Sequence, residues 1–356
     1  MTANNPALPF AQRLLDWYDR HHRDLPWRVS PPMRARGVVA DPYHVWLSEV
    51  MLQQTTVTAV KPYFAKFLTL WPKVTDLAEA PSDAVMAAWA GLGYYARARN
   101  LKKCAEAVAS LHAGRFPDTE VGLRSLPGIG DYTAAAVAAI AFDRPAAVMD
   151  GNVERVISRY FAIGEPLPGS KAAMKAKVVE VTPQERPGDF AQGMMDLGAT
   201  ICTPKRPACA LCPLKEDCLA LRLDGDPERF PVKAVKKEKP VRRAAAFVAL
   251  SPGGRIFLQR RPEKGLLGGM VQVPVTDFTS RRDGETSTGA APFAADWQPR
   301  GTVVHVFTHF ELRLDVYEAQ TDEINHVDGW WEETSRLGEQ ALPSVMKKAI
   351  EAAISA

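Results

Sequence analysis

The spacing of apolar residues changes about two thirds of the way along the 356-residue chain. In residues 42–70, apolar side chains recur close to a 3.6-residue period, as at Val45, Trp46 and Val50, and similar segments follow between short glycine or proline breaks. This period is typical of amphipathic helices, and few strand signals occur in the first 220 residues. The pattern therefore predicts a helical domain over residues 1–225.

Beyond this domain the apolar period falls to two, which is typical of strands. The alternating segments are residues 245–250, 255–258 and 302–307, and a helical pattern follows from Pro343 to Ser355. Between the two regions, residues 226–243 are rich in Lys and Arg and are interrupted by prolines, which predicts an exposed linker. A smaller α+β domain is expected over residues 244–356, so the fold class is multidomain, all-α followed by α+β.

Composition is that of an ordinary globular protein, with 46% hydrophobic and 24% charged residues. The formal net charge of +3 is small, so binding to a polyanion must depend on local basic patches. Residues 1–20 lack the continuous apolar segment of a secretory signal, and no apolar run approaches the roughly 18 residues that span a bilayer. We therefore expect an intracellular protein that does not associate with membranes.

A glycine-rich turn, LPGIGDYT at residues 126–133, leads into an alanine-rich helical segment. Gly128 and Gly130 allow close backbone approach, and the helix start offers unpaired N–H groups and a positive dipole end to an anion. The turn lacks the Gly-Lys-Ser/Thr end of a P-loop, and no strand precedes it. On these residues alone, an anion site and a plain helix–helix turn are equally good interpretations.

Two carboxylates occupy positions where the helical pattern favours apolar residues. Glu49 lies between Trp46 and Val50, and Asp150 follows the apolar residues 146–149. A buried carboxylate without a partner is costly and usually stays neutral through a raised pKa. The alternatives are a solvated helix face for Glu49 and a helix N-cap, reinforced by Asn152, for Asp150.

Four of the five cysteines lie in one short segment with the spacing C-x6-C-x2-C-x5-C: Cys202, Cys209, Cys212 and Cys218. In a reducing compartment such a group favours a metal over disulfides. The spacing matches neither the paired C-x2-C of structural zinc sites nor the ferredoxin pattern. Zinc and an iron–sulfur cluster both remain open on the spacing alone.

The turn at residues 126–130, the segment at 150–153 and the cysteine spacing together resemble the helix-hairpin-helix DNA glycosylases related to endonuclease III. Within that superfamily, the blocks WLSEVMLQQT, GLGYYARARN and MMDLGA and the C-terminal domain are similar to adenine DNA glycosylases. The resemblance covers nearly the whole chain. It implies a base excision repair enzyme that removes adenine opposite 8-oxoguanine or guanine from duplex DNA and leaves an abasic site. We expect a monomer in a bacterial-type cytoplasm, associated with the nucleoid.

The resemblance implies roles for the reacting residues. Glu49 would protonate the departing adenine at N7, and Asp150, beside Asn152, would stabilise the cationic sugar. Tyr132 stands where bifunctional relatives carry the lysine that forms a Schiff base, and a phenol cannot form that imine. We expect Tyr132 to hydrogen-bond Asp150 or to face the sugar, and the enzyme to lack efficient lyase activity.

The resemblance also implies contacts with DNA. Gly128 and Gly130 would hold backbone phosphate, which positions the protein without reading sequence. The adenine pocket is assigned to Trp27, Arg28, Leu52 and Gln192. The residues expected to displace the base or meet the opposite base are Gln53, Gln54, Thr55, Leu92 and Tyr94, with Phe307, Thr308 and His309 from the second domain. The family usually has serine where this chain has Thr308, and residues 30–40 are longer than the usual connection, so the path of this segment is left open.

For the cysteines, the resemblance implies a 4Fe-4S cluster on Cys202, Cys209, Cys212 and Cys218, with a structural and DNA-binding role. The C-terminal domain is similar to Nudix hydrolases, yet the sequence after Gly269 lacks the carboxylate-rich box that binds Mg²⁺. We therefore expect this Nudix-like domain to recognise the lesion. The alternative functions are a non-catalytic DNA-binding iron–sulfur protein and a nucleotide hydrolase.

Overall fold

The computed structural model describes residues 7–223, 225–234, 238–262, 265–321, 324 and 326–354, with side chains described from residue 10 onward. The chain divides into two compact units, one formed by Met1–Ala80 with Asn100–Val235 and the other by Pro81–Arg99 with Lys236–Ala356. Among the described helices, none is long and apolar enough to cross a membrane.

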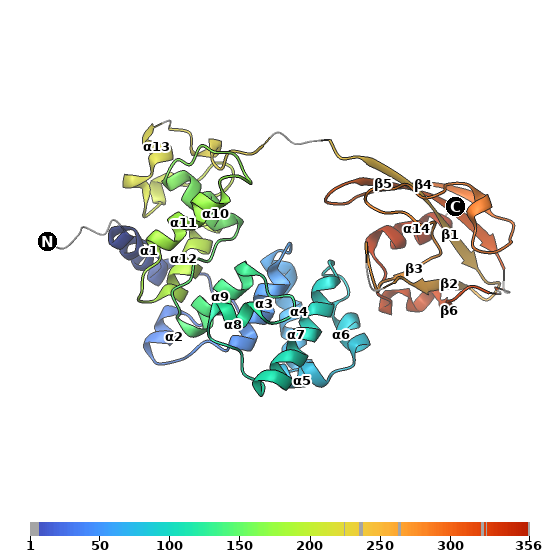
Figure 1. The fold of residues 1–356 in the computed structure, drawn as a ribbon, viewed down its shortest axis with the longest axis horizontal. Coiled ribbons are helices and arrows are strands. Elements are labelled where there is room, and N and C mark those ends of the chain that lie inside the picture. Colours follow the sequence, from blue (N-terminus) through green and yellow to red (C-terminus); the bar gives the residue numbers. More distant parts are fainter. Residues whose placement is uncertain are drawn as a thin grey trace. The chain divides into compact units, whose positions relative to one another are not determined.

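The first unit is helical, as the 3.6-residue period predicts (Figure 1). Its helices are α1 (Ala7–His21), α2 (Pro31–Ala35), α3 (Pro42–Leu52), α4 (Val57–Leu70), α5 (Val74–Glu79), most of α7 (Ala96–His112), α8 (Glu120–Arg124), α9 (Asp131–Phe142), α10 (Gly151–Tyr160), α11 (Lys171–Val181), α12 (Pro187–Thr200) and α13 (Leu219–Leu223). Short 3₁₀ helices cover Cys209–Leu211, Lys215–Asp217 and Pro227–Arg229.

Helices α9 and α12 form the centre of this unit. Residues 133–141 of α9 and 187–198 of α12 are buried, and α3 and α10 pack against these two helices. Small residues allow the close approach, because a Cβ on Gly198 would lie 2.6 Å from Asn152 Cβ and one on Gly188 would lie 2.5 Å from the carbonyl oxygen of Ala139. The packing brings the C-terminal half of α3 and the N-termini of α9 and α10 to one place.

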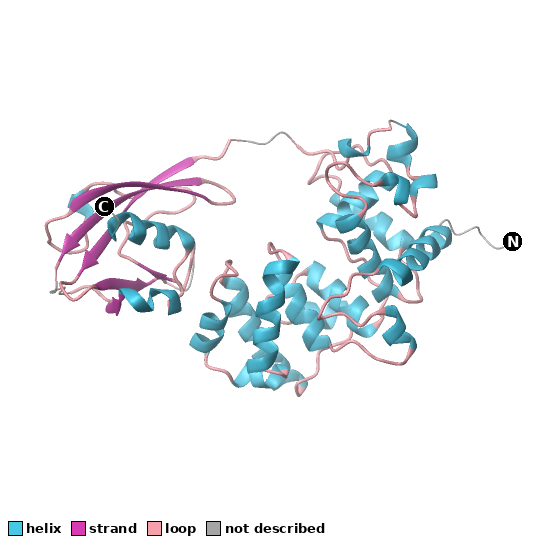
Figure 2. Ribbon diagram, turned by 180° about the vertical axis from the view of Figure 1, so that it is seen from behind, coloured by secondary structure: helices cyan, strands magenta, loops and turns pink. Residues whose placement is uncertain are grey.

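The second unit contains a mixed sheet and α14 (Ser344–Ile354) (Figure 2). Its segment Pro81–Arg99 carries α6 (Ser82–Trp89). The strands are β1 (Val241–Leu250), β2 (Arg255–Arg260), β3 (Val271–Gln272), β4 (Gln298–Val306), β5 (Glu311–Gln320) and β6 (Trp330–Glu333). They run in the order β3-β2-β1-β5-β4, with β6 paired to β2, and β1 and β5 are parallel. Alternate residues of β1 enter two apolar clusters, Ala246 on the α14 side and Phe247 on the other, as the period of two predicts.

The predicted linker is shorter in the structure than residues 226–243. Phe230 is buried, its carbonyl accepts a hydrogen bond from Arg159, and Leu167 donates its backbone N–H to the carbonyl of Val232. At the other end, β1 already begins at Val241. Residues 235–237 lie outside the described residues, as does Ser355 at the end of the predicted C-terminal helix. The apolar side chain of Phe230 explains why the first part of this basic segment packs on the helical unit.

Candidate active site

Glu49 is buried on α3 rather than on a solvated face, with only 6% of its surface exposed. Asp41 caps the start of α3 by accepting the N–H of Tyr43, and all residues from 45 to 51 are buried. Burial raises the pKa of Glu49, against the hydrogen bond from Tyr132 and the charge of Arg28, which lower it. The carboxyl is thereby favoured in its protonated form, which a general acid needs.

Tyr132 is the hydrogen-bond partner of Glu49. Its hydroxyl donates to Glu49 Oε2 across 2.7 Å and lies 3.7 Å from the sulfur of Met195. The sequence had paired Tyr132 with Asp150 or with the sugar. The structure replaces Asp150 by Glu49 as the hydrogen-bond partner, and the contact with the sugar stays a prediction. The physical reason is helix packing, since α9 lies directly on α3 and the first turn of α9 faces Glu49. Burial first, and then the charge of Glu49, raise the pKa of the phenol well above its ordinary value.

Asp150 is the N-cap of α10. Its carboxylate accepts the backbone N–H groups of Asn152 and Val153 at 2.9 and 2.8 Å and the side-chain amide of Asn152 at 2.8 Å. The N-cap interpretation is therefore confirmed. Three donors and the positive end of the helix dipole stabilise negative charge on this carboxylate. Its charge also raises the pKa of Glu49, so the two carboxylates lie within electrostatic reach of each other.

A small pocket opens beside Glu49. Its lining residues are Trp27, Arg28, Val45, Ser48, Glu49, Ile140, Gln192 and Met195. The structure thus brings together four predicted residues, Trp27, Arg28, Glu49 and Gln192, from three distant parts of the sequence. Leu52 is half-buried at the end of α3 and does not line this pocket. No sequence pattern indicated Ile140 or Met195, whose surroundings are those of core residues, whereas Val45 could have been found one turn before Glu49.

Arg28 is held in the pocket wall by a buried carboxylate. Its Nη1 atom donates to both oxygens of Asp196, at 2.8 and 2.9 Å, and Arg23 donates to the same carboxylate through its backbone N–H and Nε. Burial lowers the pKa of Arg28, but the charge and hydrogen bonds of Asp196 outweigh it. Arg28 therefore stays charged beside Glu49, and its hydrogen bonds to Asp196 on α12 fix its orientation.

Gln192 presents an unused acceptor. Its side chain is 1% exposed, Nε2 donates to the carbonyl of Gly188 at 3.3 Å, and Oε1 has no hydrogen-bond partner in the part of the chain that the structure describes. A buried carbonyl without a donor is unfavourable, so this atom is suited to a ligand that supplies an N–H group.

The hairpin between α8 and α9 depends on one of its two glycines. Gly128 has a φ of +75°, and a Cβ there would lie 2.5 Å from Asn100 Cβ, so both the conformation and the contact require glycine. Gly130 is different: it is the N-cap of α9 with an ordinary extended conformation, and nothing lies within 4 Å of an added Cβ. Conformation therefore requires glycine at position 128 and not at position 130. Gly130 instead leaves the N-terminus of α9 open.

The residues expected to displace the adenine or to contact the opposite base differ in solvent exposure. Gln54 and Tyr94 are exposed and both have positive φ angles, 58° and 48°, which non-glycine residues seldom adopt. Arg97 packs over the ring of Tyr94 at 5.5 Å. Leu92 is buried, so its side chain is not presented at the surface.

Two further predicted residues make contacts at the end of α3. Gln53 donates to the hydroxyl of Thr133 at 3.2 Å, and Thr55 donates to the carbonyl of Gln53. Both side chains are half-buried. These contacts tie the segment before α4 to the first turn of α9.

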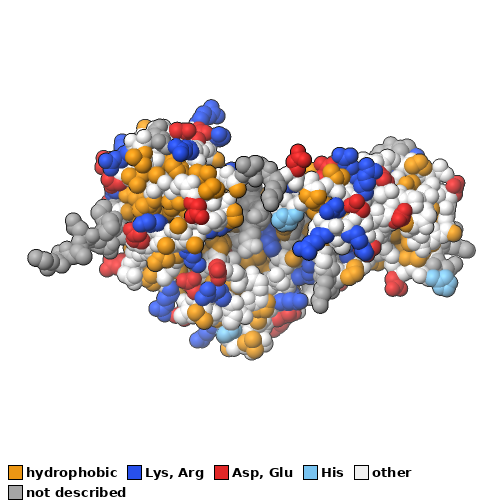
Figure 3. Space-filling view, turned by 45° about the horizontal axis from the view of Figure 1, so that its top comes forward, with side chains coloured by type: hydrophobic (Ala, Val, Ile, Leu, Met, Phe, Trp, Pro, Cys, Tyr) orange, Lys and Arg blue, Asp and Glu red, His pale blue; other side chains and the backbone are white. Residues whose placement is uncertain are grey.

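In the second unit, Phe307, Thr308 and His309 form the turn between β4 and β5. Thr308 and His309 are exposed, and Phe307 stacks on Phe310 with ring centroids 4.7 Å apart. The strand predicted through residue 307 ends at Val306, so these residues extend from a turn rather than alternate along a strand. Figure 3 shows Lys and Arg side chains gathered on the visible face of this unit.

The four cysteines lie around α10. Burial and the charges of the other three cysteines raise the pKa of Cys212 to about 12, so the four thiols are close enough to influence one another. Arg159, 2% exposed, donates to Cys202 Sγ at 3.3 Å and to the carbonyl of Thr203. Among the described residues, no three His, Cys, Asp or Glu side chains are grouped so that they could hold a metal ion.

A chain of hydrogen bonds joins the cysteine segment to Asp150. Arg155 donates to the carbonyl of Cys202 at 2.7 Å and to Asn152 Oδ1 at 2.9 Å, and Asn152 donates to Asp150. Asn152 is thus a positioning residue for the carboxylate, and the sequence pattern did not indicate the part played by Arg155.

The helical unit has the architecture of a known class of repair protein. Residues 47–183 match the family described as HhH-GPD superfamily base excision DNA repair protein, and residues 245–352 match the NUDIX domain family. A thermostable thymine-DNA glycosylase has a similar structure, with a TM-score of 0.54 and 31% identity over 62% of this chain and 99% of that one. The fold and the paired carboxylates define a helix-hairpin-helix DNA glycosylase followed by a Nudix-like domain.

Whole-chain similarity is more specific. The chain is 35% identical to adenine DNA glycosylase of Mus musculus over 88% of this chain and 71% of that protein. It is 37% identical to adenine DNA glycosylase of Buchnera aphidicola subsp. Acyrthosiphon pisum over 72% of this chain and 71% of that protein. The chain belongs to the adenine DNA glycosylase family, whose members are hydrolases of N-glycosyl bonds in base excision repair.

Proposed function

We propose that this enzyme removes adenine paired with 8-oxoguanine or guanine from duplex DNA, by protonating the base from Glu49, and leaves an abasic site. The observation that carries the proposal is the buried Glu49 carboxyl, fixed by the Tyr132 hydroxyl at 2.7 Å and placed at the wall of a pocket. A neutral acid at this position can donate its proton to a base that enters the pocket.

The order of events follows from the contacts of the two carboxylates. Tyr132 occupies Glu49 Oε2, so Oε1 carries the proton that passes to adenine N7. The bond between N9 and C1′ then breaks, and its electron pair leaves with the base. Asp150, surrounded by three N–H donors, would face the cationic sugar and bond to C1′ transiently. Water then adds at C1′ as the bond to Asp150 breaks, and the proton that the water loses returns to Glu49.

Recognition of adenine rests on Gln192 in this proposal. Its free Oε1 accepts a hydrogen bond from the exocyclic N6 amino group of the base. Trp27 supplies an aromatic surface in the same pocket, and Arg28 supplies a fixed positive charge. A base without the amino group leaves Gln192 Oε1 unpaired, which is how a buried polar group discriminates between ligands.

The excised adenine must first leave the base stack. The exposed Tyr94, over whose ring Arg97 packs, would fill the vacated space, where base–aromatic stacking is worth about 1 to 3 kcal/mol. The open N-terminus of α9 and its hairpin hold backbone phosphate. Thr308 and His309, exposed beyond Phe307, contact 8-oxoguanine.

We propose that the enzyme acts as a monomer on chromosomal DNA, in a bacterial-type cytoplasm.

We propose that the four cysteines hold a 4Fe-4S cluster, whose binding would draw their side chains together, because no three of them are grouped as metal ligands among the described residues. Burial and the charges of the other three cysteines raise the pKa of Cys212, and Arg159 donates to Cys202 Sγ, a contact that would stabilise a thiolate ligand. Cys202, Cys209, Cys212 and Cys218 would hold the cluster, which would fix the fold of this segment. Lys205, Arg206 and Lys215 are exposed on the same loops and would contact phosphates.

The test uses duplexes with A opposite 8-oxoguanine, G or T. The enzyme should release free adenine from the first two duplexes, and strands should break only after alkali because Tyr132 cannot form an imine. Breaks without alkali would contradict the monofunctional course. DNA binding without adenine release from any duplex would favour the non-catalytic alternative, and release of phosphate from oxidised nucleotides would favour the hydrolase.

A further inference from the structure

Arg34 lies in residues 30–40, the inserted segment, which the sequence analysis expects to be longer than the usual family connection. It is on α2, within residues 30–40, and this segment begins directly after the pocket residues Trp27 and Arg28. The Arg34 side chain is only 17% exposed, so it points into the protein although α2 itself has no fully buried residue. The inserted segment is therefore anchored to the helical unit by this side chain.

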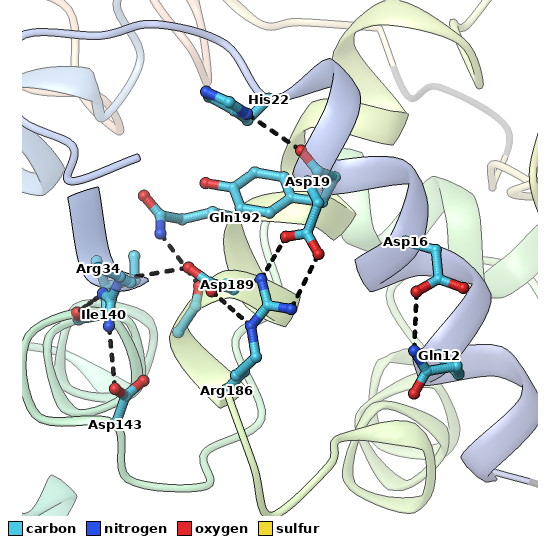
Figure 4. Close-up of polar contacts among 12 residues, drawn as sticks. Gln12, Asp16, Asp19, His22, Arg34, Ile140, Asp143, Arg186, Asp189 and Gln192 are labelled. Atoms are coloured by element: carbon cyan, nitrogen blue, oxygen red, sulfur yellow. Dashed lines mark hydrogen bonds and ion pairs between the residues drawn. The ribbon is translucent and has the colours of Figure 1, made fainter. Parts of the chain in front are cut away.

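The guanidinium of Arg34 joins two helices (Figure 4). Nη2 donates to the carbonyl of Ile140 at 2.6 Å and Nη1 to Asp143 Oδ2 at 3.0 Å, both at the C-terminal end of α9. Nε lies 3.3 Å from Asp189 Oδ1, in the first turn of α12, as an ion pair. One arginine thus ties α2 to the end of α9 and the start of α12.

The two helix ends form the wall of the pocket. Ile140 lines the pocket directly, and Gln192 follows Asp189 by one turn of α12. Gly188 allows α12 to touch α9, since a Cβ there would lie 2.5 Å from the carbonyl of Ala139, and its own carbonyl accepts the hydrogen bond that orients the Gln192 amide. A shift between these helix ends would move Gln192 Oε1.

We propose that Arg34 is a positioning residue for base recognition. It holds the end of α9 against the start of α12, so that Gly188 orients Gln192 and the free Oε1 meets the N6 amino group of adenine. The inference rests on the proposed function, because it takes adenine as the ligand of Gln192. It gives the inserted segment a role in selecting the base, separate from the proton transfer by Glu49.

The rest of the network keeps the Asp189 carboxylate paired when Arg34 is removed. Asp189 also accepts hydrogen bonds from Arg186, which pairs with Asp19 on α1 (Figure 4). The buried carboxylate thus retains a cation, and the costly unpaired charge is avoided. We therefore expect Arg34→Ala to fold, which thermal unfolding checks.

The experiment compares adenine with purine, which keeps N7 but lacks the N6 amino group, each opposite 8-oxoguanine under single-turnover conditions. Arg34→Ala should slow adenine excision about 10-fold, the effect of one misplaced hydrogen bond, and leave purine excision within about twofold. Arg34→Lys retains the charge and should recover part of the adenine rate. Arg36→Ala, an exposed arginine of the same segment, should match the unaltered enzyme for both bases.

A double-mutant cycle links the effect to Gln192. In a Gln192→Leu background, Arg34→Ala should cause little further loss with adenine, because the contact it positions is already absent. If Arg34→Ala slowed the excision of adenine and purine equally, or if the rate losses of the two substitutions were additive, the effect would be a general structural one and the inference would be overturned. The inference would also be overturned if the ratio of adenine to purine excision rates in Arg34→Ala equalled that of the unaltered enzyme. If the unaltered enzyme released no adenine, both the proposed function and the inference about Arg34 would fail.

Discussion

The hydroxyl of Tyr132 donates a hydrogen bond to Glu49 Oε2 across 2.7 Å, joining α9 to α3 at the wall of the pocket. In the proposed mechanism, this contact holds the Glu49 carboxyl that protonates the base. It also lowers the pKa of Glu49, against the stronger effect of burial.

Tyr132→Phe should keep the pocket but free the Glu49 carboxyl. We expect about 10-fold slower adenine excision, consistent with the loss of one buried hydrogen bond. Because the hydrogen bond lowers the pKa of Glu49, its removal raises that pKa and moves the alkaline limb of the pH–rate profile to higher pH. Single-turnover rates across pH check both effects. An unchanged rate and profile would contradict the role of the hydroxyl.

Glu49→Gln should abolish most activity yet stabilise the fold at neutral pH. The folded pKa of Glu49 is raised, so the unfolded chain ionises more readily and the native state loses stability as pH rises above the unfolded pKa. Glutamine removes this loss. The melting temperature of the variant should exceed that of the parent at pH 7.5, with a smaller difference near pH 5. A lower melting temperature at pH 7.5 would contradict the assigned burial cost.

Asp150 combines helix capping with charge, and two substitutions separate these effects. Asp150→Asn retains an N-cap acceptor, so the free energy of unfolding should change by less than about 0.5 kcal/mol while excision falls about 10²-fold or more. Asp150→Ala also loses the cap, worth about 1 kcal/mol. Urea unfolding and excision rates distinguish the two. Full activity of Asp150→Asn would exclude a catalytic charge.

The two hairpin glycines offer a matched pair. Gly128→Ala introduces a Cβ at positive φ and close to Asn100, and should destabilise the protein by about 1 to 3 kcal/mol and weaken DNA binding. Gly130→Ala has space and an ordinary conformation, so the fold should be retained. Thermal unfolding and salt-dependent DNA affinity measure both. Equal stability of the two variants would contradict the conformational argument.

The sequence patterns predicted most of the helices and strands and singled out the two carboxylates, but they did not predict the contact between Tyr132 and Glu49. Glu49 stood out as a lone carboxylate in an apolar helix, and Asp150 as an acceptor before a helix start. The partner of Tyr132 depends on how α9 packs on α3, which no local pattern specifies. Arg34 was not recognised because its segment has no apolar period, and Ile140, which it contacts, is 106 residues away.

The most direct test of the account is the pH dependence of single-turnover adenine release from a duplex with A opposite 8-oxoguanine. If Glu49 acts as a buried acid, the rate should remain high well above pH 4.5, near the ordinary pKa of glutamate, and decline only on the alkaline side. Glu49→Gln should lose about 10²- to 10⁴-fold at pH values below the alkaline decline, where Glu49 of the parent is protonated. A rate that already declines from pH 4.5, or a Glu49→Gln variant as fast as the parent, would contradict the account.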